Sequence, residues 1–180
     1  MASEADRRAG GEGGGRLGSD RRRGRTTGRR LALAAIFEAD FGQRTAEAIL
    51  ERHLADTERD PVAADLAREL VAAVVRNRVE IDALIDRTAP RHPVTSLAKM
   101  DRALLRSAIG EVLHSATPAR VAIAEWVELA RVYSGEAMRR LMNGVLGTIS
   151  PTPSSEEGVS GHNVRPAQED RRRAARRRRG

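Results

Sequence analysis

Aliphatic side chains recur every three or four residues along most of the chain between residues 27 and 149. This spacing places them on one face of an α-helix, whereas a half-buried strand needs strict alternation, which no segment shows. Only four aromatic residues accompany them, so a core has to be built from Leu, Val, Ile, Ala and Met. The pattern predicts an all-α protein, a helical bundle with short loops.

The periodic region divides into about six helices, separated by glycine, proline and capping residues. We expect these helices at about residues 27–41, 44–57, 60–89, 95–113, 117–130 and 136–149. Gly42 follows the first helix and is expected to end it. Asp60 precedes Pro61, which is the usual order of a capping acid and a proline at the first helical position. Thr117 and Pro118 open the fifth helix in the same way.

The net charge of +7 comes from the two ends of the chain. Residues 1–30 carry nine arginines against four acidic side chains, and residues 151–180 carry eight against four. Residues 1–25 and 151–180 contain few apolar side chains, so we expect disordered basic tails around one domain at 26–150. The domain itself is nearly neutral, and a nucleic-acid site on it would therefore be a local patch.

The sequence lacks the features of several functional classes. It contains no cysteine, which excludes disulfides and thiolate metal sites, and its four histidines lie in separate segments without metal-ligand spacing. Lys99 is the single lysine, so no phosphate-binding loop ending in Gly-Lys-Ser/Thr exists. Neither a signal peptide nor a membrane span is apparent. We expect a cytoplasmic protein that is not an enzyme and binds no cofactor, metal or membrane.

Three blocks in the second half of the chain resemble the NusB family of bacterial transcription antitermination factors. Residues 101–112 resemble the family's acid-base pair followed by an aliphatic-Leu-Arg step and a Glu-Leu pair. Residues 117–131 resemble its Pro, Val, Ile-Asn-Glu, Val-Glu-Leu-Ala-Lys block, and residues 142–146 its Val-Asn-Gly-Val-Leu signature. The expected first helix agrees as well, and the resemblance extends over residues 28–150.

The resemblance implies a fold and a function. NusB proteins consist of two three-helix subdomains. They pair with NusE, a ribosomal small-subunit protein, and the pair binds the boxA element of nascent RNA. That complex joins RNA polymerase and other Nus factors, so that ribosomal RNA operons are read through terminators. We therefore expect RNA, NusE and the RNA polymerase antitermination complex as partners.

The start of the first helix is the favoured RNA site. Arg25, Arg29 and Arg30 cluster where the basic tail meets the domain, and a guanidinium pairs with phosphate and stacks on bases. The alternative is a solvated basic arm. Phe37 occupies the position of the family's Tyr, where a ring would stack on a base. Because Phe37 shares a helix face with Leu33 and Phe41 and lacks the hydroxyl of the family's Tyr, core packing is the favoured alternative.

Further candidates lie in the second half of the chain. Arg139 and Arg140 precede Leu141, where many relatives have Phe beside bound RNA, and the two arginines either hold phosphate or form an exposed basic turn. By resemblance, Asp101 belongs to the surface that meets NusE, and Arg102 and Glu111 are placed with it. Pairing within the helix is the alternative for these charges.

Two other functions remain open at this point. An RNA cytosine methyltransferase carries a NusB-like accessory module, but a catalytic domain would have to follow residue 149, where only a polar tail is found. A homodimer with an occluded RNA surface, lacking antitermination activity, is the other possibility.

Overall fold

The computed structural model describes the backbone of residues 9–55 and 60–150, and the side chains of these ranges from residue 17 onward. Within these ranges the chain forms helices and no strand, which confirms the predicted all-α fold. The helices are α1 (Ala9–Ala39), α2 (Ala46–Ala55), α3 (Pro61–Arg76), α4 (Arg78–Thr88), α5 (Lys99–His114), α6 (Ala119–Ser134) and α7 (Glu136–Ile149). The predicted tail at 151–180 lies outside the described residues.

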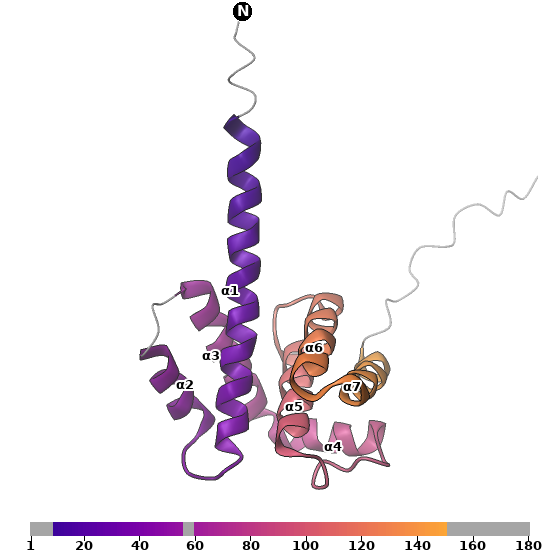
Figure 1. Cartoon of the computed structure of the whole chain (residues 1–180). Helices are drawn as coiled ribbons and strands as arrows, with labels where there is room; N and C mark the ends of the chain where they lie inside the picture. The colour runs from indigo at the N-terminus through magenta and orange to yellow at the C-terminus, as the bar shows by residue number, and fades with distance from the viewer. Residues whose placement is uncertain (1–8, 56–59, 151–180) are drawn as a thin grey trace, which may run out of the picture. The chain divides into compact units, whose positions relative to one another are not determined.

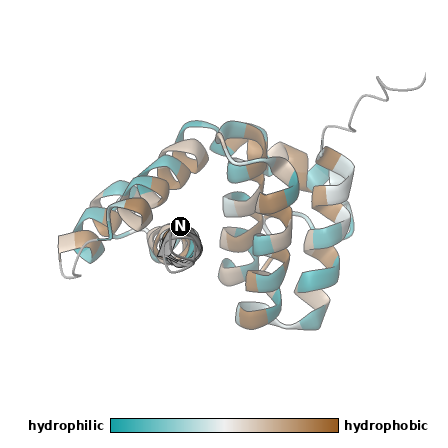
Figure 2. Ribbon diagram, turned by 90° about the horizontal axis from the view of Figure 1, so that it is seen from above, coloured by the Kyte–Doolittle hydropathy of each residue, from teal (hydrophilic) through white to brown (hydrophobic). Residues whose placement is uncertain are grey.

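The helices form two groups that meet along α1, α3 and α5. Helices α1, α2 and α3 pack on one another, while α4 packs on α5 and α7, and α6 packs on the same two helices (Figure 1). Seen from above, α1 stands end-on between the α2–α3 pair and the second group (Figure 2). The N-terminal group has the three helices that the resemblance implies, whereas the second group has four.

The fourth helix of the second group comes from a break at Asn77. One helix was expected over 60–89, but α3 ends at Arg76 and α4 begins at Arg78. The Asn77 amide Nδ2 donates to the Ala73 carbonyl at 2.8 Å, and the Asn77 backbone leaves helical geometry with ψ at 17°. Asparagine side chains compete with the backbone for such carbonyls, which disfavours a continuous helix. The break places α4 against α5 and α7.

Helix α1 begins much earlier than predicted. It starts at Ala9, eighteen residues before the expected start at residue 27. Contact with the start of α3 accounts for the helix as far back as Gly24, because a Cβ built on Gly24 would collide with the Asp60 side chain and one on Gly28 would lie 2.7 Å from the carbonyl oxygen of Ala63.

The capping signal at the start of α3 is confirmed, whereas the one at Thr117 and Pro118 is not, because Pro118 itself is the N-cap residue of α6 and no side-chain cap is formed. Asp60 Oδ1 accepts a 2.9 Å hydrogen bond from the Val62 backbone N–H, with Pro61 at the first helical position, as predicted. Helix α7 has the predicted bounds, and Gly42, at φ +78°, lies in the turn that follows α1. Helix α5 begins at Lys99, three to four residues later than expected.

The core is aliphatic, as the composition predicted. Its largest fully buried apolar side chains come from both groups: Leu33, Ile49, Leu50, Leu70, Ile81, Ile85, Leu104, Leu105, Ile109, Trp126 and Met142. No helix in the part of the chain that the structure describes is both long and apolar enough to cross a membrane.

Candidate nucleic-acid interface

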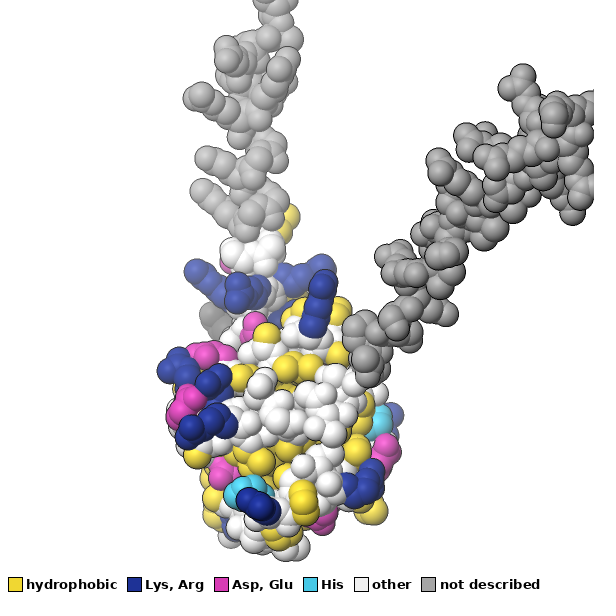
Figure 3. Space-filling view, turned by 90° about the vertical axis from the view of Figure 1, so that its right-hand side faces the viewer, with side chains coloured by type: hydrophobic (Ala, Val, Ile, Leu, Met, Phe, Trp, Pro, Cys, Tyr) yellow, Lys and Arg dark blue, Asp and Glu magenta, His cyan; other side chains and the backbone are white. Residues whose placement is uncertain are grey.

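Arginines and hydroxyl residues line one face of α1 where it extends from the bundle. They border a recess of about 520 Å³ and are Ser19, Arg22, Arg23, Thr26, Thr27 and Arg30. Their spacing of three and four residues places them on a single face, which we call the arginine-hydroxyl face. Figure 3 shows basic side chains gathered where α1 leaves the bundle. Guanidinium groups and hydroxyls both donate hydrogen bonds to phosphate oxygens.

Arg29, the favoured RNA residue of the sequence analysis, is buried instead. It is only 1 % exposed, and its guanidinium donates two hydrogen bonds to Glu111, Nε to Oε2 at 2.9 Å and Nη2 to Oε1 at 2.7 Å. Trp126 Nε1 donates to the same carboxylate at 2.7 Å. The expectation of RNA contact at Arg29 is therefore corrected to a structural role, because the guanidinium is enclosed and already paired.

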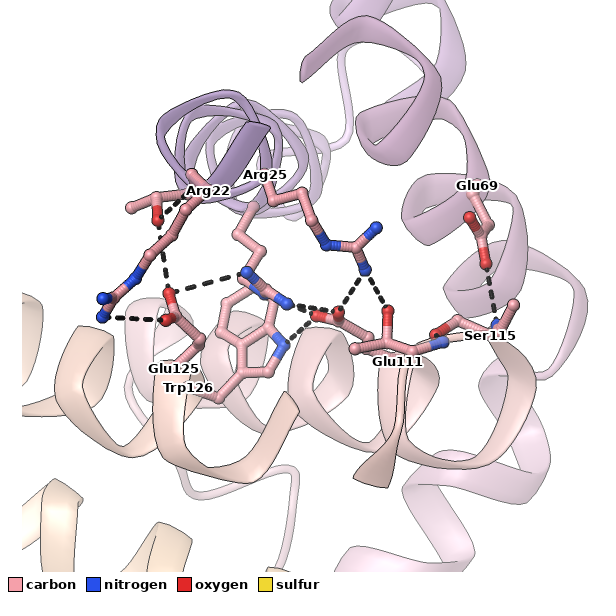
Figure 4. Close-up of polar contacts among 11 residues, drawn as sticks. Arg22, Arg25, Glu69, Glu111, Ser115, Glu125 and Trp126 are labelled. Carbon is pink, nitrogen blue, oxygen red and sulfur yellow. Dashed lines mark hydrogen bonds and ion pairs between the residues drawn. The ribbon is translucent and has the colours of Figure 1, made fainter. Parts of the chain in front are cut away.

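Arg25 and Arg22 extend this ion cluster toward the surface. Arg25 Nη2 donates to Thr117 Oγ1 at 2.5 Å and lies 4.0 Å from Glu111 Oε1. Arg22, which is largely exposed, lies 3.9 Å from Glu125 (Figure 4). The cluster thus connects α1 to α5 and α6. Arg25 points into the bundle with about a third of its side chain exposed, so it is less available to RNA than the sequence suggested.

A second ion cluster connects the turn after α1 to α4 and α5. Arg106 donates to Asp82 at 2.7 and 2.8 Å and to Asp40 at 3.0 Å. Arg102 Nε donates to Asp40 Oδ2 at 2.8 Å, and its side chain is 17 % exposed. These contacts hold the C-terminal end of α1 against the second group of helices.

The three residues expected to meet a protein partner have different positions. Glu111 is fully buried and Arg102 is held by Asp40, so the expectation of partner contact is corrected for both. Asp101 is half-buried at the start of α5 and accepts a hydrogen bond from the Ser134 hydroxyl at the end of α6. Of the three, only Asp101 keeps a carboxylate near the surface.

A groove with aromatic walls lies between α1, α5 and α6. It has a volume of about 260 Å³ and is lined by Arg30, Leu33, Ala34, Phe37, Glu38, Phe41, Met100 and Tyr133. The Phe37 and Phe41 rings meet edge to face, with centroids 5.3 Å apart. Lys99 Nζ lies 3.7 Å from the Phe41 centroid, within the range of a cation–π contact. We call this the aromatic groove.

The surroundings of Phe37 combine core packing with a position on a surface groove. It packs against the core and is half-buried, and it also lines the aromatic groove. The sequence analysis did not identify Phe41, Tyr133 or Lys99 as site residues. Three of the chain's four aromatic residues meet here. Phe37 and Phe41 are one helical turn apart, but Tyr133 is so distant in the sequence that spacing could not reveal that it joins them.

The two arginines of α7 differ in their surroundings. Arg139 donates to Glu136 at 2.6 and 2.9 Å, and this hydrogen bond is the main reason why the pKa of Glu136 lies below its ordinary value of 4.5. Arg140 is exposed and borders a recess of about 380 Å³ with Arg91 and His92. That recess shares no lining residue with the aromatic groove.

Among the described residues, no group of three or more His, Asp or Glu side chains is placed to hold a metal ion. The charged clusters instead consist of arginine and carboxylate pairs within the fold.

Comparison with known proteins decides the family. Residues 26–151, about two thirds of the chain, match the sequence profile of the NusB family. The chain belongs to the NusB family. The predicted resemblance is confirmed. The matched segment contains the residues that line the aromatic groove and the C-terminal half of the arginine-hydroxyl face. Residues 19–25 of that face precede the matched segment.

Relatives from several bacteria carry the name transcription antitermination protein NusB, which describes no enzyme. The protein of Dehalococcoides mccartyi is 36 % identical over 127 residues, covering 70 % of this chain and 89 % of the relative. That of Chloroflexus aggregans is 36 % identical over 137 residues, covering 74 % and 89 %.

Solved NusB structures share the fold. Thermotoga maritima NusB aligns with a TM-score of 0.62 at 30 % identity, covering 70 % of this chain and 89 % of that protein. A NusB chain crystallised with NusE and double-stranded RNA aligns with a TM-score of 0.63 at 22 % identity, covering 70 % and 95 %.

Proposed function

We propose that this protein is a transcription antitermination factor that binds RNA with NusE. The observation that carries the proposal is family membership, supported by relatives named for antitermination at about 36 % identity over most of their length. The RNA is of the boxA type found in ribosomal RNA operon transcripts, and the complex acts on RNA polymerase. The NusB structure with NusE and RNA supports this choice of partners through its fold.

RNA binds across the arginine-hydroxyl face of α1, which includes Arg30. The face supplies guanidinium and hydroxyl donors to successive phosphates, whereas Arg29 beneath it holds the helix in position. Arg140 adds a second, smaller basic surface with Arg91 on the other group of helices. Phosphate contacts of this kind make affinity depend steeply on salt.

NusE binds near Asp101 in this proposal. The Asp101 carboxylate and the Ser134 hydroxyl lie together at adjoining ends of α5 and α6, beside the aromatic groove that Tyr133 and Met100 line. Arg102 and Glu111 support this surface from within, through Asp40 and Arg29 respectively.

A binding titration tests the proposed function. Full-length protein is titrated against boxA-type RNA and a scrambled RNA of equal length, at two salt concentrations, with and without NusE. We expect tighter binding of the boxA-type RNA, further tightening with NusE, and a steep loss of affinity with salt.

Equal affinity for both RNAs in the presence of NusE would contradict the proposal, and would reduce the protein to a non-specific basic binder. Sedimentation of the same samples distinguishes a homodimer that must dissociate before binding RNA from a protein that binds as a monomer. Asp101→Asn provides the control for the partner, because it should weaken the NusE effect and leave binding of RNA alone unchanged.

A further inference from the structure

Glu125 of α6 contacts the arginine-hydroxyl face of α1. Its Oε2 accepts a 3.3 Å hydrogen bond from the Thr26 hydroxyl, and its Oε1 lies 3.9 Å from Arg22 Nη2. Both partners line the recess of that face. Figure 4 shows the Glu125 carboxylate directed from α6 toward α1 and Arg22. Part of the face is therefore held by a carboxylate of the same chain.

These two contacts are weak enough to be exchanged. The Arg22 side chain is 82 % exposed, and its distance from Glu125 is close to the 4 Å limit of an ion pair. The Thr26 hydroxyl also lies 3.2 Å from the Arg22 carbonyl oxygen, so its single proton has a second acceptor at hand. A stronger acceptor that reaches the face can therefore replace Glu125 at both groups.

Glu125 keeps a partner when these two contacts are lost. Arg29 Nη1 lies 3.5 Å from Glu125 Oε2, and the Arg29 guanidinium is fixed by its two hydrogen bonds to Glu111. A buried carboxylate without any cation is costly, but Glu125 retains Arg29 and is also 21 % exposed to water. Release of Arg22 and Thr26 thus leaves no isolated charge behind.

We propose that Glu125 competes with RNA for the arginine-hydroxyl face: its carboxylate holds Arg22 and Thr26 in the free protein and yields them to an RNA phosphate. Guanidinium and hydroxyl groups donate to carboxylate and phosphate oxygens alike. This inference rests on the proposed RNA-binding function, and it identifies a residue that limits the affinity of the RNA site.

A purely structural role for Glu125 is the competing explanation, because Arg29 is one of its partners. The two explanations predict opposite signs. A structural residue, when altered, leaves RNA binding unchanged or weakens it together with the fold. A competitor, when neutralised, strengthens RNA binding.

Neutralisation of Glu125 in the full-length protein tests the proposal. Glu125→Gln keeps the size of the side chain and one oxygen acceptor but removes the charge. We expect it to tighten binding of boxA-type RNA by roughly 1.5- to 5-fold, the range that corresponds to one exposed ion pair. Glu128→Gln is the matched control, because Glu128 lies in the same helix and pairs with Arg131, which is not part of the face.

Salt and RNA sequence sharpen this result. The gain in affinity should shrink as salt is raised, since salt screens the repulsion between a carboxylate and a phosphate. It should be the same for boxA-type and scrambled RNA, because phosphate contacts carry no sequence information.

A double-variant cycle shows whether the gain passes through the two proposed partners. In a protein that carries Arg22→Gln and Thr26→Val, the further change Glu125→Gln should no longer tighten RNA binding. An undiminished gain in that protein would mean that Glu125 acts only as a general negative charge, and the proposal would be wrong.

A measurement on the unaltered protein does not depend on how the variants fold. With carbon-13 in the glutamate carboxylates, the NMR signal of Glu125 should move when RNA is added, whereas that of Glu128 should stay in place. A Glu125 signal that stays in place while RNA binds overturns the proposal.

The failures of the two proposals are distinguishable. If Glu125→Gln unfolds in urea like the unaltered protein and binds RNA equally or more weakly, the competition proposal is wrong while the proposed function stands. If the unaltered protein does not bind the RNA even with NusE, the proposed function fails, and the competition proposal fails with it.

Discussion

Two pairs of adjacent arginines, one in α1 and one in α7, look alike in the sequence but differ in the structure. In α1, Arg29 is buried against Glu111, whereas Arg30 is exposed beside two recesses. In α7, Arg139 pairs with Glu136 at the surface and Arg140 is exposed. Each pair thus combines one arginine held by a carboxylate with one that faces outward.

The difference between the pairs is the burial of the carboxylate. Glu111 is fully buried and accepts hydrogen bonds from Arg29 and Trp126, so its carboxylate is enclosed with these partners. Glu136 is more than half exposed and water can replace Arg139. A buried ion pair is costly to break on one side, whereas an exposed pair contributes little. The ion pair of Arg29 is therefore important for the stability of the fold, whereas that of Arg139 contributes little to it.

The largest effect is expected from breaking the Arg29–Glu111 pair. Arg29→Met or Glu111→Gln alone should lower the free energy of unfolding by about 3–5 kcal/mol, because each leaves a buried charge without its main partner. Urea unfolding followed by circular dichroism measures the change. The double variant should lose less than the sum of the single losses, and strict additivity would show that the two side chains do not interact.

The glycines near the two pairs should respond in opposite directions to alanine. Gly28→Ala should destabilise the protein by about 1–3 kcal/mol, because the new Cβ would lie 2.7 Å from the Ala63 carbonyl oxygen. Gly144→Ala meets no atom within 4 Å and should stabilise α7 by about 0.5–1 kcal/mol. Thermal unfolding of both variants provides the measurement, and destabilisation by Gly144→Ala would contradict the expected open surroundings.

The outward-facing arginines should affect RNA binding without affecting stability. Arg30→Gln should reduce the salt slope of RNA binding by about 0.7 and weaken binding at low salt, because one phosphate contact is lost. Arg140→Gln should have a smaller effect, since its recess lies apart from the face of α1. RNA titrations at several salt concentrations measure both. A larger effect at Arg140 would move the main RNA site to the second group of helices.

The smallest effect is expected from Arg139→Gln. The pKa of Glu136 is lowered chiefly by the hydrogen bond from Arg139, so the pair stabilises the fold above the ordinary pKa of 4.5. This contribution is lost as the pH falls through the lowered pKa. The variant should therefore be slightly less stable than the unaltered protein near neutral pH and equal to it in strong acid. Thermal midpoints measured across this range check the sign, and a difference that grows in acid would contradict it.

Much of the fold could be predicted from the sequence because its signals are local. Asp60 and Pro61 marked the start of α3, and the spacing of Met138, Met142 and Val145 marked the buried face of α7. The break at Asn77 was missed because an asparagine in a continuous apolar pattern is no strong stop signal. The early start of α1 was missed because glycine and arginine composition does not report contact with α3.

The candidate site was less predictable than the fold. Arg30 and Arg140 were placed at the surface by the sequence and are found there, but Arg29, Arg102 and Glu111 lie within ion clusters. A helical pattern assigns hydrophobic residues to the inside, and it gives no sign that an arginine is inside as well. Its partner, Glu111, is 82 residues away in the chain.

The sequence alone determined that this protein is helical, that its core is aliphatic and that it resembles NusB, because periodicity, composition and short sequence blocks can be recognised within single segments. The tertiary structure decided which arginines face outward and which hold the bundle together, and it brought Phe37, Phe41 and Tyr133 to one groove. Both outcomes depend on which helices meet, and the contacts between α1, α5 and α6 join residues far apart in the chain.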